Sequence, residues 1–137
     1  MTPSNAASSY NLKHAVLGTY PNFTMDYPNV LVSRGEVAPA FNQVATSTVA
    51  ATITFSWDDN SDEMNADPLD KTLLLIYNPT KNQSVYFNGL TSRSAGTETI
   101  TVPNSFSGDT VHCYIAYINE DESDVSNSAY AGAIAVI

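Results

Sequence analysis

The clearest pattern in the chain is an alternation of apolar and polar residues that ends at the only Trp. Ile53, Phe55 and Trp57 fall on one face of this segment. Thr52 and Thr54 fall on the other face. Because successive side chains of a strand point to opposite faces of its sheet, a period of two predicts a β-strand with one buried face.

More strands are expected along the rest of the chain after residue 37. The run Leu73–Tyr77 is apolar throughout, which is typical of a central strand buried on both faces. Asn88-Gly89 is a dipeptide that favours a primed hairpin turn, so it predicts that the preceding strand stops there. About seven strands are expected in all, at residues 38–47, 48–57, 71–78, 84–87, 97–102, 110–119 and 125–136.

The number and spacing of these strands predict the architecture. Turn signals separate them at the spacing typical of a sandwich, and consecutive strands usually pair or lie close together. We therefore expect an all-β, immunoglobulin-like antiparallel β-sandwich over residues 37–137.

The N-terminal part of the chain has a different pattern. Residues 3–17 predict a short helix, with Gly18 as its stop signal. Residues 23–26 and 30–33 read as two short strands that form a hairpin. Residues 1–36 are thus expected to be a helix-and-hairpin appendage to the sandwich.

Charge limits the kinds of partner that this chain suits. Fourteen acidic residues stand against five basic ones, which gives a net charge of -9. A nucleic-acid binder needs a basic face, and the five cations here are scattered singly. We therefore expect no nucleic-acid partner and no membrane insertion, since no run approaches the ~20 apolar residues of a membrane span. The start of the chain lacks the basic and apolar segments of a signal peptide.

Candidate catalytic groups are few. Cys113 lies within an apolar run and is expected to be a buried thiol with no base beside it. His14 and His112 lie on different elements and have no partner at metal-binding spacing, so a structural role is expected for each. Without a nucleophile–base pair, we expect no enzymatic activity and no cofactor.

Two acidic segments are the best candidates for a cation site. Six carboxylates fall within residues 58–70 and four more within residues 120–124. In a sandwich these two loops lie at the same end, and Ca²⁺ takes six to eight oxygen ligands. The spacing matches no Ca²⁺ motif, so a solvated acidic cap is the alternative. The candidate Ca²⁺ ligands are Asp58, Asp59, Asp62, Asp70, Asp121 and Asp124.

The eight Tyr residues are expected to be mainly structural. Tyr77, Tyr114 and Tyr117 lie on predicted central strands and are expected in the core. The remaining aromatic positions near the appendage are expected to pack it onto the sandwich, or to form a partner surface. These positions are Tyr10, Tyr20, Tyr27 and Tyr130.

The segment from residue 51 to 136 resembles a fibronectin type III domain. Trp57 ends its second strand, Tyr114-Ile-Ala-Tyr-Ile-Asn119 forms its sixth, and Ser126-x-Ser128 follows the last hairpin. The Leu-x-Pro and Tyr of the usual corner are replaced here by Val102-Pro103 and Val111.

The whole chain is similar to a family of uncharacterised proteins common in Bacteroidota. Members tend to carry a further N-terminal region rich in Gly and basic residues, so the resemblance implies the C-terminal part of a longer protein, or a shortened relative. It implies no catalytic residues. The similar stretches are Asn5-Ala-Ala, Tyr10-Asn-Leu-Lys, Gly18-Thr-Tyr-Pro-Asn-Phe, Ser33-Arg-Gly, Phe55-Ser-Trp-Asp-Asp-Asn, Tyr77-Asn-Pro-Thr-Lys, Arg93-Ser-Ala-Gly, Phe106-Ser-Gly-Asp-Thr-Val-His and Val125-Ser-Asn-Ser-Ala-Tyr-Ala-Gly.

Together these features predict a structural or interaction module of a larger cell-surface or particle assembly. Its partner is expected to be another protein or further copies of itself. A carbohydrate-binding or Ca²⁺-dependent adhesion module is the second candidate, and a small hydrolase is the third.

Overall fold

The computed structural model describes residues 16–19, 22–25, 27 and 33–137. The described residues form strands, turns and short 3-10 helices such as η2 (Arg93–Ala95) and η3 (Asn104–Phe106). Within them no helix is long and apolar enough to cross a membrane.

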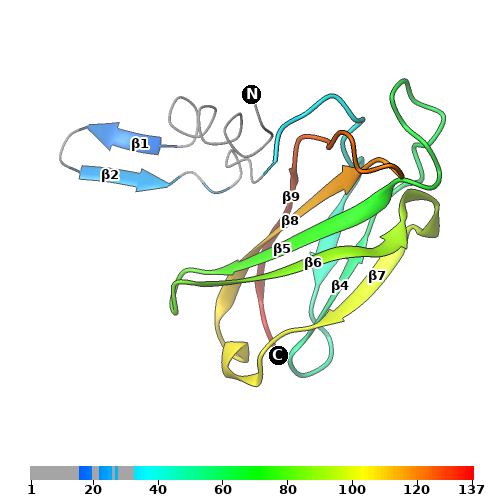
Figure 1. Ribbon diagram of the computed structural model, residues 1–137. Coiled ribbons are helices and arrows are strands. Elements are labelled where there is room, and N and C mark those ends of the chain that lie inside the picture. Colours follow the sequence, from blue (N-terminus) through cyan, green and yellow to red (C-terminus); the bar gives the residue numbers. More distant parts are fainter. Residues whose placement is uncertain (1–15, 20–21, 26, 28–32) are drawn as a thin grey trace.

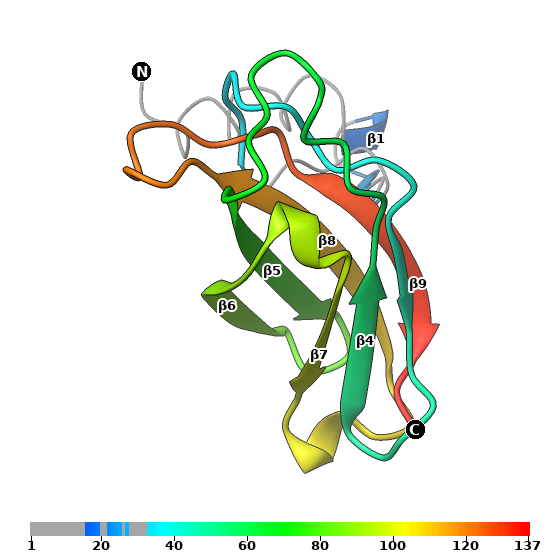
Figure 2. The same ribbon diagram turned by 90° about the vertical axis from the view of Figure 1, so that its right-hand side faces the viewer.

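Two antiparallel sheets face each other (Figures 1 and 2). The smaller sheet has the order β3-β4-β7 and the larger has the order β6-β5-β8-β9. This arrangement confirms the predicted immunoglobulin-like sandwich of seven strands. The strands are β3 (Val44–Thr46), β4 (Thr52–Ser56), β5 (Lys71–Asn78), β6 (Gln83–Ser92), β7 (Thr97–Thr101), β8 (Thr110–Ile118) and β9 (Ala129–Ala135).

The core lies between the inner faces of the two sheets. β4 contributes Ile53 and Phe55, which are fully buried as their alternation predicts. Leu74 of β5 pairs with Ile115 of β8, and both are fully buried. Each such side chain contributes about 1.5–3 kcal/mol through the apolar area that it removes from water. The core therefore holds the two sheets together through the packing of buried apolar side chains.

Strand β5 differs from the expectation of burial on both faces. Leu74 and Ile76 are fully buried, whereas Leu73, Leu75 and Tyr77 on the other face are half-buried. A two-layer sandwich covers only one face of each sheet, so the apolar run of β5 leaves part of its outer face accessible.

Strand β6 is longer than predicted, and Asn88-Gly89 is not the turn at its end. The strand continues to Ser92, which lies opposite Lys71 of β5. Its pairing shifts register between Asn88 and Ser92, which marks an irregularity of the bulge type. Gly is common where a strand bulges. The Asn-Gly signal therefore marked a bulge inside the strand.

The N-terminal hairpin is also shifted from its predicted position. β1 (Val16–Thr19) pairs with β2 (Asn22–Met25) in a separate two-stranded sheet. The strand predicted at 23–26 thus has an upstream partner, and the predicted helix does not extend through residues 16 and 17. Residues 3–15 and 30–32 lie outside the described residues, and a domain boundary at residue 36 remains a prediction.

Residues 33–37 are bound to the connection between β8 and β9. The Ser33 hydroxyl donates to the carbonyl of Ser126 (2.8 Å), and Val37 N–H donates to the carbonyl of Val125 (3.1 Å). Gly35 N–H donates to Asn127 Oδ1 (3.0 Å). We call residues 33–37 the strap.

Gly35 is required for this close approach. A Cβ atom at this position would lie 2.1 Å from the carbonyl oxygen of Val125, which is backbone and cannot move aside cheaply. Gly35→Ala is therefore expected to lower the free energy of unfolding by about 1–3 kcal/mol, the usual cost of overpacking. Urea denaturation monitored by Trp57 fluorescence measures this change.

The matched variant is Asn127→Ala, which removes the hydrogen bond but adds no atom to the contact. It is expected to cost less than Gly35→Ala. An equal cost for the two variants would show that the hydrogen bond, and not the close approach, matters here.

Candidate functional site

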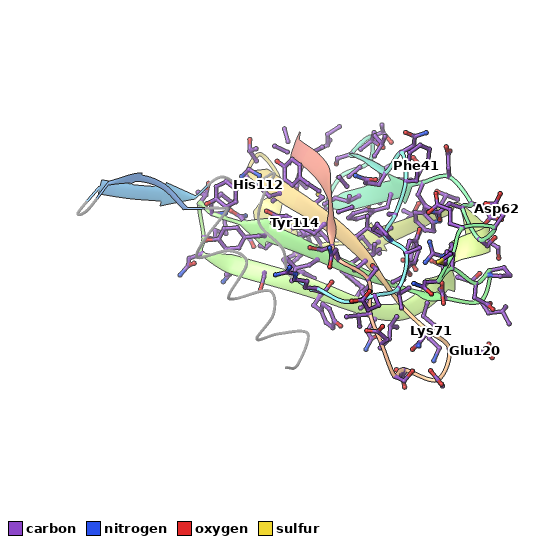
Figure 3. The ribbon with its side chains drawn as sticks, turned by 90° about the horizontal axis from the view of Figure 1, so that it is seen from above. Phe41, Asp62, Lys71, His112, Tyr114 and Glu120 are labelled. Carbon is purple, nitrogen blue, oxygen red and sulfur yellow. The ribbon has the colours of Figure 1, made fainter. Side chains whose placement is uncertain are left out.

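The two acidic loops meet at one end of the sandwich. Residues 58–70 and 120–124 carry ten of the fourteen carboxylates, and we call this end the acidic pole. Asp62 and Glu120 lie there, far from His112 (Figure 3). The loops follow β4 and β8, whose chains run in the same direction toward this pole. The expectation that the two loops share one end of the fold is therefore correct.

Two adjoining hollows lie between these loops. The larger is a wide, open groove of about 570 Å³, and the smaller is a hollow of about 230 Å³. Asp67, Asp70 and Asn119 border both. Glu120 and Asp121 complete the border of the groove. The smaller hollow is completed by Glu36, Val37, Asn65, Ala66 and Asp124.

Three of the candidate Ca²⁺ ligands lie early in the first loop, and none of them borders either hollow. Asp58 accepts a hydrogen bond from Asn42 Nδ2 (2.7 Å). Asp59 accepts hydrogen bonds from the backbone N–H (3.1 Å) and the hydroxyl of Ser61. Asp62 is exposed. The contacts of Asp58 and Asp59 shape the loop locally.

The candidate ligands of the second loop also stabilise their own turn. Asp121 accepts hydrogen bonds from the Ser123 hydroxyl (2.8 Å) and the Ser123 N–H (3.3 Å). These bonds lower the pKa of Asp121, because they favour its charged form. Asp124 accepts from the N–H of Val125 (2.8 Å).

The structure thus brings together only part of the predicted set. Asp70 shares the groove with Asp121 and the smaller hollow with Asp124. Among the described residues, no group of three or more His, Cys, Asp or Glu side chains is placed to hold a metal ion. The Ca²⁺ site remains a prediction.

Beneath the acidic pole lies a fully buried arginine that was not among the candidate residues. Arg93 Nε donates to Asp70 Oδ2 (3.0 Å), and Arg93 Nη2 lies 2.9 Å from the same oxygen in the ion pair. Its Nη1 donates to Asn60 Oδ1 (2.7 Å), and Nη2 also donates to the carbonyl of Ala38 (2.8 Å). The guanidinium carbon lies 3.9 Å from the centroid of the Tyr117 ring. Four chain segments therefore converge on one cation.

Backbone and ring contacts complete this cluster. Arg93 N–H donates to the carbonyl of Asp70 (2.8 Å), and Trp57 Nε1 donates to the carbonyl of Arg93 (2.8 Å). Trp57 meets the Tyr117 ring edge-on at 6.4 Å between centroids. The only Trp is therefore fixed by the same residue that holds Asp70.

The energy of this buried pair comes from its complete set of partners. Removing a carboxylate and a guanidinium from water costs several kcal/mol per ion, and good geometry with further hydrogen bonds offsets that cost. Because Asp70 is committed to Arg93 and also accepts from Asp67 N–H (2.9 Å), its Oδ2 atom is turned inward. Asp70 is therefore a poorer cation ligand than its place on the groove alone indicates.

The hydroxyl of Tyr117 is buried and has no hydrogen-bond partner among the described residues. Burial raises the pKa of this phenol, and the nearby charge of Arg93 lowers it by a smaller amount. Tyr117 lies in the core as predicted. Tyr114 is buried outside the core, on the outer face of the larger sheet, where Tyr77 is half-buried. Tyr117 thus stays neutral and acts as the ring beneath the guanidinium.

His112 lies in an aromatic cluster on the outer face of the larger sheet. Its ring stacks on Tyr27 with centroids 3.9 Å apart, and its Nδ1 is hydrogen-bonded to Tyr130 (2.8 Å). The Tyr114 hydroxyl donates to the carbonyl of Tyr27 (3.0 Å). Burial lowers the pKa of His112, because it disfavours the imidazolium. Tyr27 therefore packs against the sandwich, as expected, whereas Tyr10 and Tyr20 lie outside the described residues.

Cys113 is fully buried in the core. Burial raises the pKa of its thiol to about 12. The protonated thiol is a poor nucleophile, so this residue behaves as a small apolar side chain.

Glu98 is a buried carboxylate on the inner face of β7. Its partner across the sandwich is the Thr72 hydroxyl, at 3.4 Å. Burial raises the pKa of Glu98, and the side-chain hydrogen bonds from Thr72 and Thr91 lower it by less. The charged form of Glu98 therefore opposes folding.

The described residues define a fibronectin type III-like β-sandwich, a class of domain in which the fold alone fixes no activity. The chain belongs to a family of unknown function, DUF6266, whose model matches residues 1–132. No curated protein matches the chain.

Two solved structures are similar to the sandwich. The fn3 domain of the human collagen alpha-1(XX) chain has 17% identity and a TM-score of 0.47, and the match covers 74% of this chain and 88% of that one. A β-sandwich protein from a computer-based redesign has 15% identity and a TM-score of 0.46, over 74% of this chain and 94% of that one. At these identities the likeness concerns the fold alone.

The first prediction from this site concerns Arg93. Arg93→Met leaves the Asp70 carboxylate buried without its countercharge, and is expected to cost about 3–5 kcal/mol of unfolding free energy. The double variant Arg93→Met with Asp70→Asn is expected to lose less than the sum of the two single variants, because neither charge then remains unpaired. Urea denaturation of the four proteins measures the coupling. Additive losses would contradict the pairing described above.

The stability of the fold is expected to depend on pH through Glu98. The pKa of Glu98 is raised in the folded state above its ordinary value of 4.5. The contribution of Glu98 to the free energy of unfolding is therefore fully present below pH 4.5, and it is lost as the pH rises through the folded-state pKa. Glu98→Gln is therefore expected to melt above the wild type at pH 7, with the difference vanishing below about pH 4.5. Melting curves from pH 4 to pH 8 measure it. Glu120→Gln at the exposed pole is the control, and an equal rise there would point to net charge alone.

Proposed function

We propose that this protein is a non-catalytic building module that associates with further protein molecules in a larger cell-surface or particle assembly. The observation that carries this proposal is the distribution of charge over the sandwich. Across the seven strands β3 to β9, all of them in the described part of the chain, Lys71 and Glu98 are the only Asp, Glu, Lys or Arg residues. Glu98 points inward.

Neutral sides suit contact with other proteins. The centres of protein interfaces are depleted in charged residues and enriched in aromatic ones. The exposed side of β7 presents Thr97, Thr99 and Thr101, and β6 presents Tyr86 with 58% of its surface exposed. The acidic pole meanwhile keeps the chain soluble through its net charge. The sides can therefore dock while one end remains hydrated.

A carbohydrate-binding or Ca²⁺-dependent adhesion module is the second candidate. The observation in its favour is the groove that the two acidic loops share, where an ion would bridge Asp67 and Asp121. The commitment of Asp70 to Arg93 weighs against it. The building-module proposal does not use this groove, so the two candidates respond differently to Ca²⁺.

Light scattering behind a sizing column separates them. The proposal expects a mass that is a multiple of the 14.7 kDa chain, unchanged by millimolar Ca²⁺. Melting curves with and without Ca²⁺ are expected to coincide, because a ligand that does not bind cannot stabilise the fold.

A monomer whose melting temperature climbs with Ca²⁺ would transfer support to the adhesion module. A monomer at every protein concentration, indifferent to Ca²⁺, would contradict the building-module proposal.

A further inference from the structure

The larger sheet ends in an edge strand that no other described strand covers. β6 is the terminal strand in the order β6-β5-β8-β9, and β5 is its hydrogen-bonded neighbour. Figure 1 shows it along the outside of the larger sheet. The side chains of Gln83, Ser84, Tyr86 and Asn88 are exposed. Alternate N–H and C=O groups along β6 therefore point away from β5, and among the described residues no second strand pairs with them.

Over residues 83–88, within the described part of the chain, this edge lacks the usual protection against pairing. Edge strands are commonly guarded by charged residues, Pro, β-bulges, short length or cover from another element. The bulge-type irregularity of β6 lies after residue 88. β6 spans ten residues and contains no charged residue and no Pro. Among the other edges, β3 has three residues, β9 lies beside β3, and β7 has five residues including the inward-pointing Glu98. The long unguarded edge is thus β6.

The regular part of this edge is self-complementary. Residues 83–88 pair with β5 in unbroken register, so they form a straight segment before the irregularity. Side chains directly opposite each other in a continuous sheet lie on the same face, whereas neighbours along a strand lie on opposite faces. A twofold axis between two copies of this strand must therefore pass through a residue and not between two residues. An axis through Tyr86 places Tyr86 opposite its copy. Val85 then lies opposite Phe87, and Ser84 opposite Asn88.

We propose that the edge formed by residues 83–88 of β6 pairs antiparallel with the same edge of a second copy, about a twofold axis at Tyr86. The two larger sheets then form one continuous eight-stranded sheet. Across the two strands, Tyr86 then faces Tyr86, apolar Val85 faces Phe87, and polar Ser84 faces Asn88. Such cross-strand pairs stabilise a sheet. This inference rests on the proposed function and names the partner and the surface.

Charge favours a second copy in this orientation. β6 ends at Ser92, and the following Arg93 contacts Asp70 at the acidic pole. Antiparallel pairing therefore places the two acidic poles at opposite ends of the dimer. Ten of the fourteen carboxylates of each copy are kept far from those of the other. A chain of net charge -9 thus meets its copy along a strand that carries no charge.

A charge at the axis tests the pairing. Tyr86→Glu places two carboxylates directly opposite each other, so the dissociation constant is expected to rise about tenfold or more. Val49→Glu is the matched control, because Val49 is 61% exposed on the connection between β3 and β4 and lies away from β6. Sedimentation equilibrium of the full chain at several concentrations measures both variants. Melting curves check that each variant is folded.

Disulfide formation tests the register independently. Tyr86→Cys is expected to cross-link to its own copy under mild oxidation. Ser84→Cys alone is not expected to cross-link, because residue 84 lies opposite residue 88 of the second copy. The double variant Ser84→Cys with Asn88→Cys is expected to cross-link. Cys113 is fully buried and does not compete.

The outcomes separate this inference from the proposed function. A multimer that survives Tyr86→Glu, or in which Ser84→Cys alone cross-links as well as Tyr86→Cys, overturns the β6 pairing and leaves assembly by another surface. A wild-type chain that is monomeric throughout overturns both. The pairing is supported if Tyr86→Glu loses the multimer, Val49→Glu keeps it, and Tyr86→Cys cross-links to its own copy.

Discussion

The buried contact between Arg93 and Asp70 is the constraint on which the acidic end of the molecule depends. The guanidinium draws together the segment at Ala38, the loop residue Asn60, the start of β5 and the ring of Tyr117. Few apolar side chains lie in the 58–70 loop, so a hydrophobic core cannot hold it. A cation that hydrogen-bonds three of these segments replaces such a core, because each hydrogen bond holds its segment in a defined direction.

This constraint also decides what the acidic loops offer to solvent. Asp70 faces inward to the guanidinium, and Asp121 is bound within its own turn. Carboxylates that appear alike in the sequence therefore divide into those that hold the fold and those that remain hydrated. The concentration of charge at one end leaves the strands almost free of it.

The sequence allowed much of the fold to be predicted, because short-range patterns decide it. The alternation around Phe55 and the apolar run of β5 identify core strands by local order alone. The turn predicted at Asn88-Gly89 was wrong, because only the pairing with the neighbouring strand determines whether such a dipeptide forms a turn or a bulge. Arg93 was missed for a related reason. Its partners Ala38, Asn60, Asp70 and Tyr117 are scattered along the chain, and nothing near residue 93 distinguishes a buried cation from an exposed one.

The path of the chain through the sandwich has a mechanical consequence. The strap enters beside the β8–β9 connection at the acidic pole, whereas Ile137 is hydrogen-bonded to Ala51 and Ser47 at the opposite end. A load applied between Gly35 and Ile137 would run along the strands, and many ladder hydrogen bonds would resist it together in shear. Resistance to such a load is set by the rate of unfolding and not by equilibrium stability. The rate at which β9 separates from β8 would therefore matter more under such a load than the free energy of unfolding.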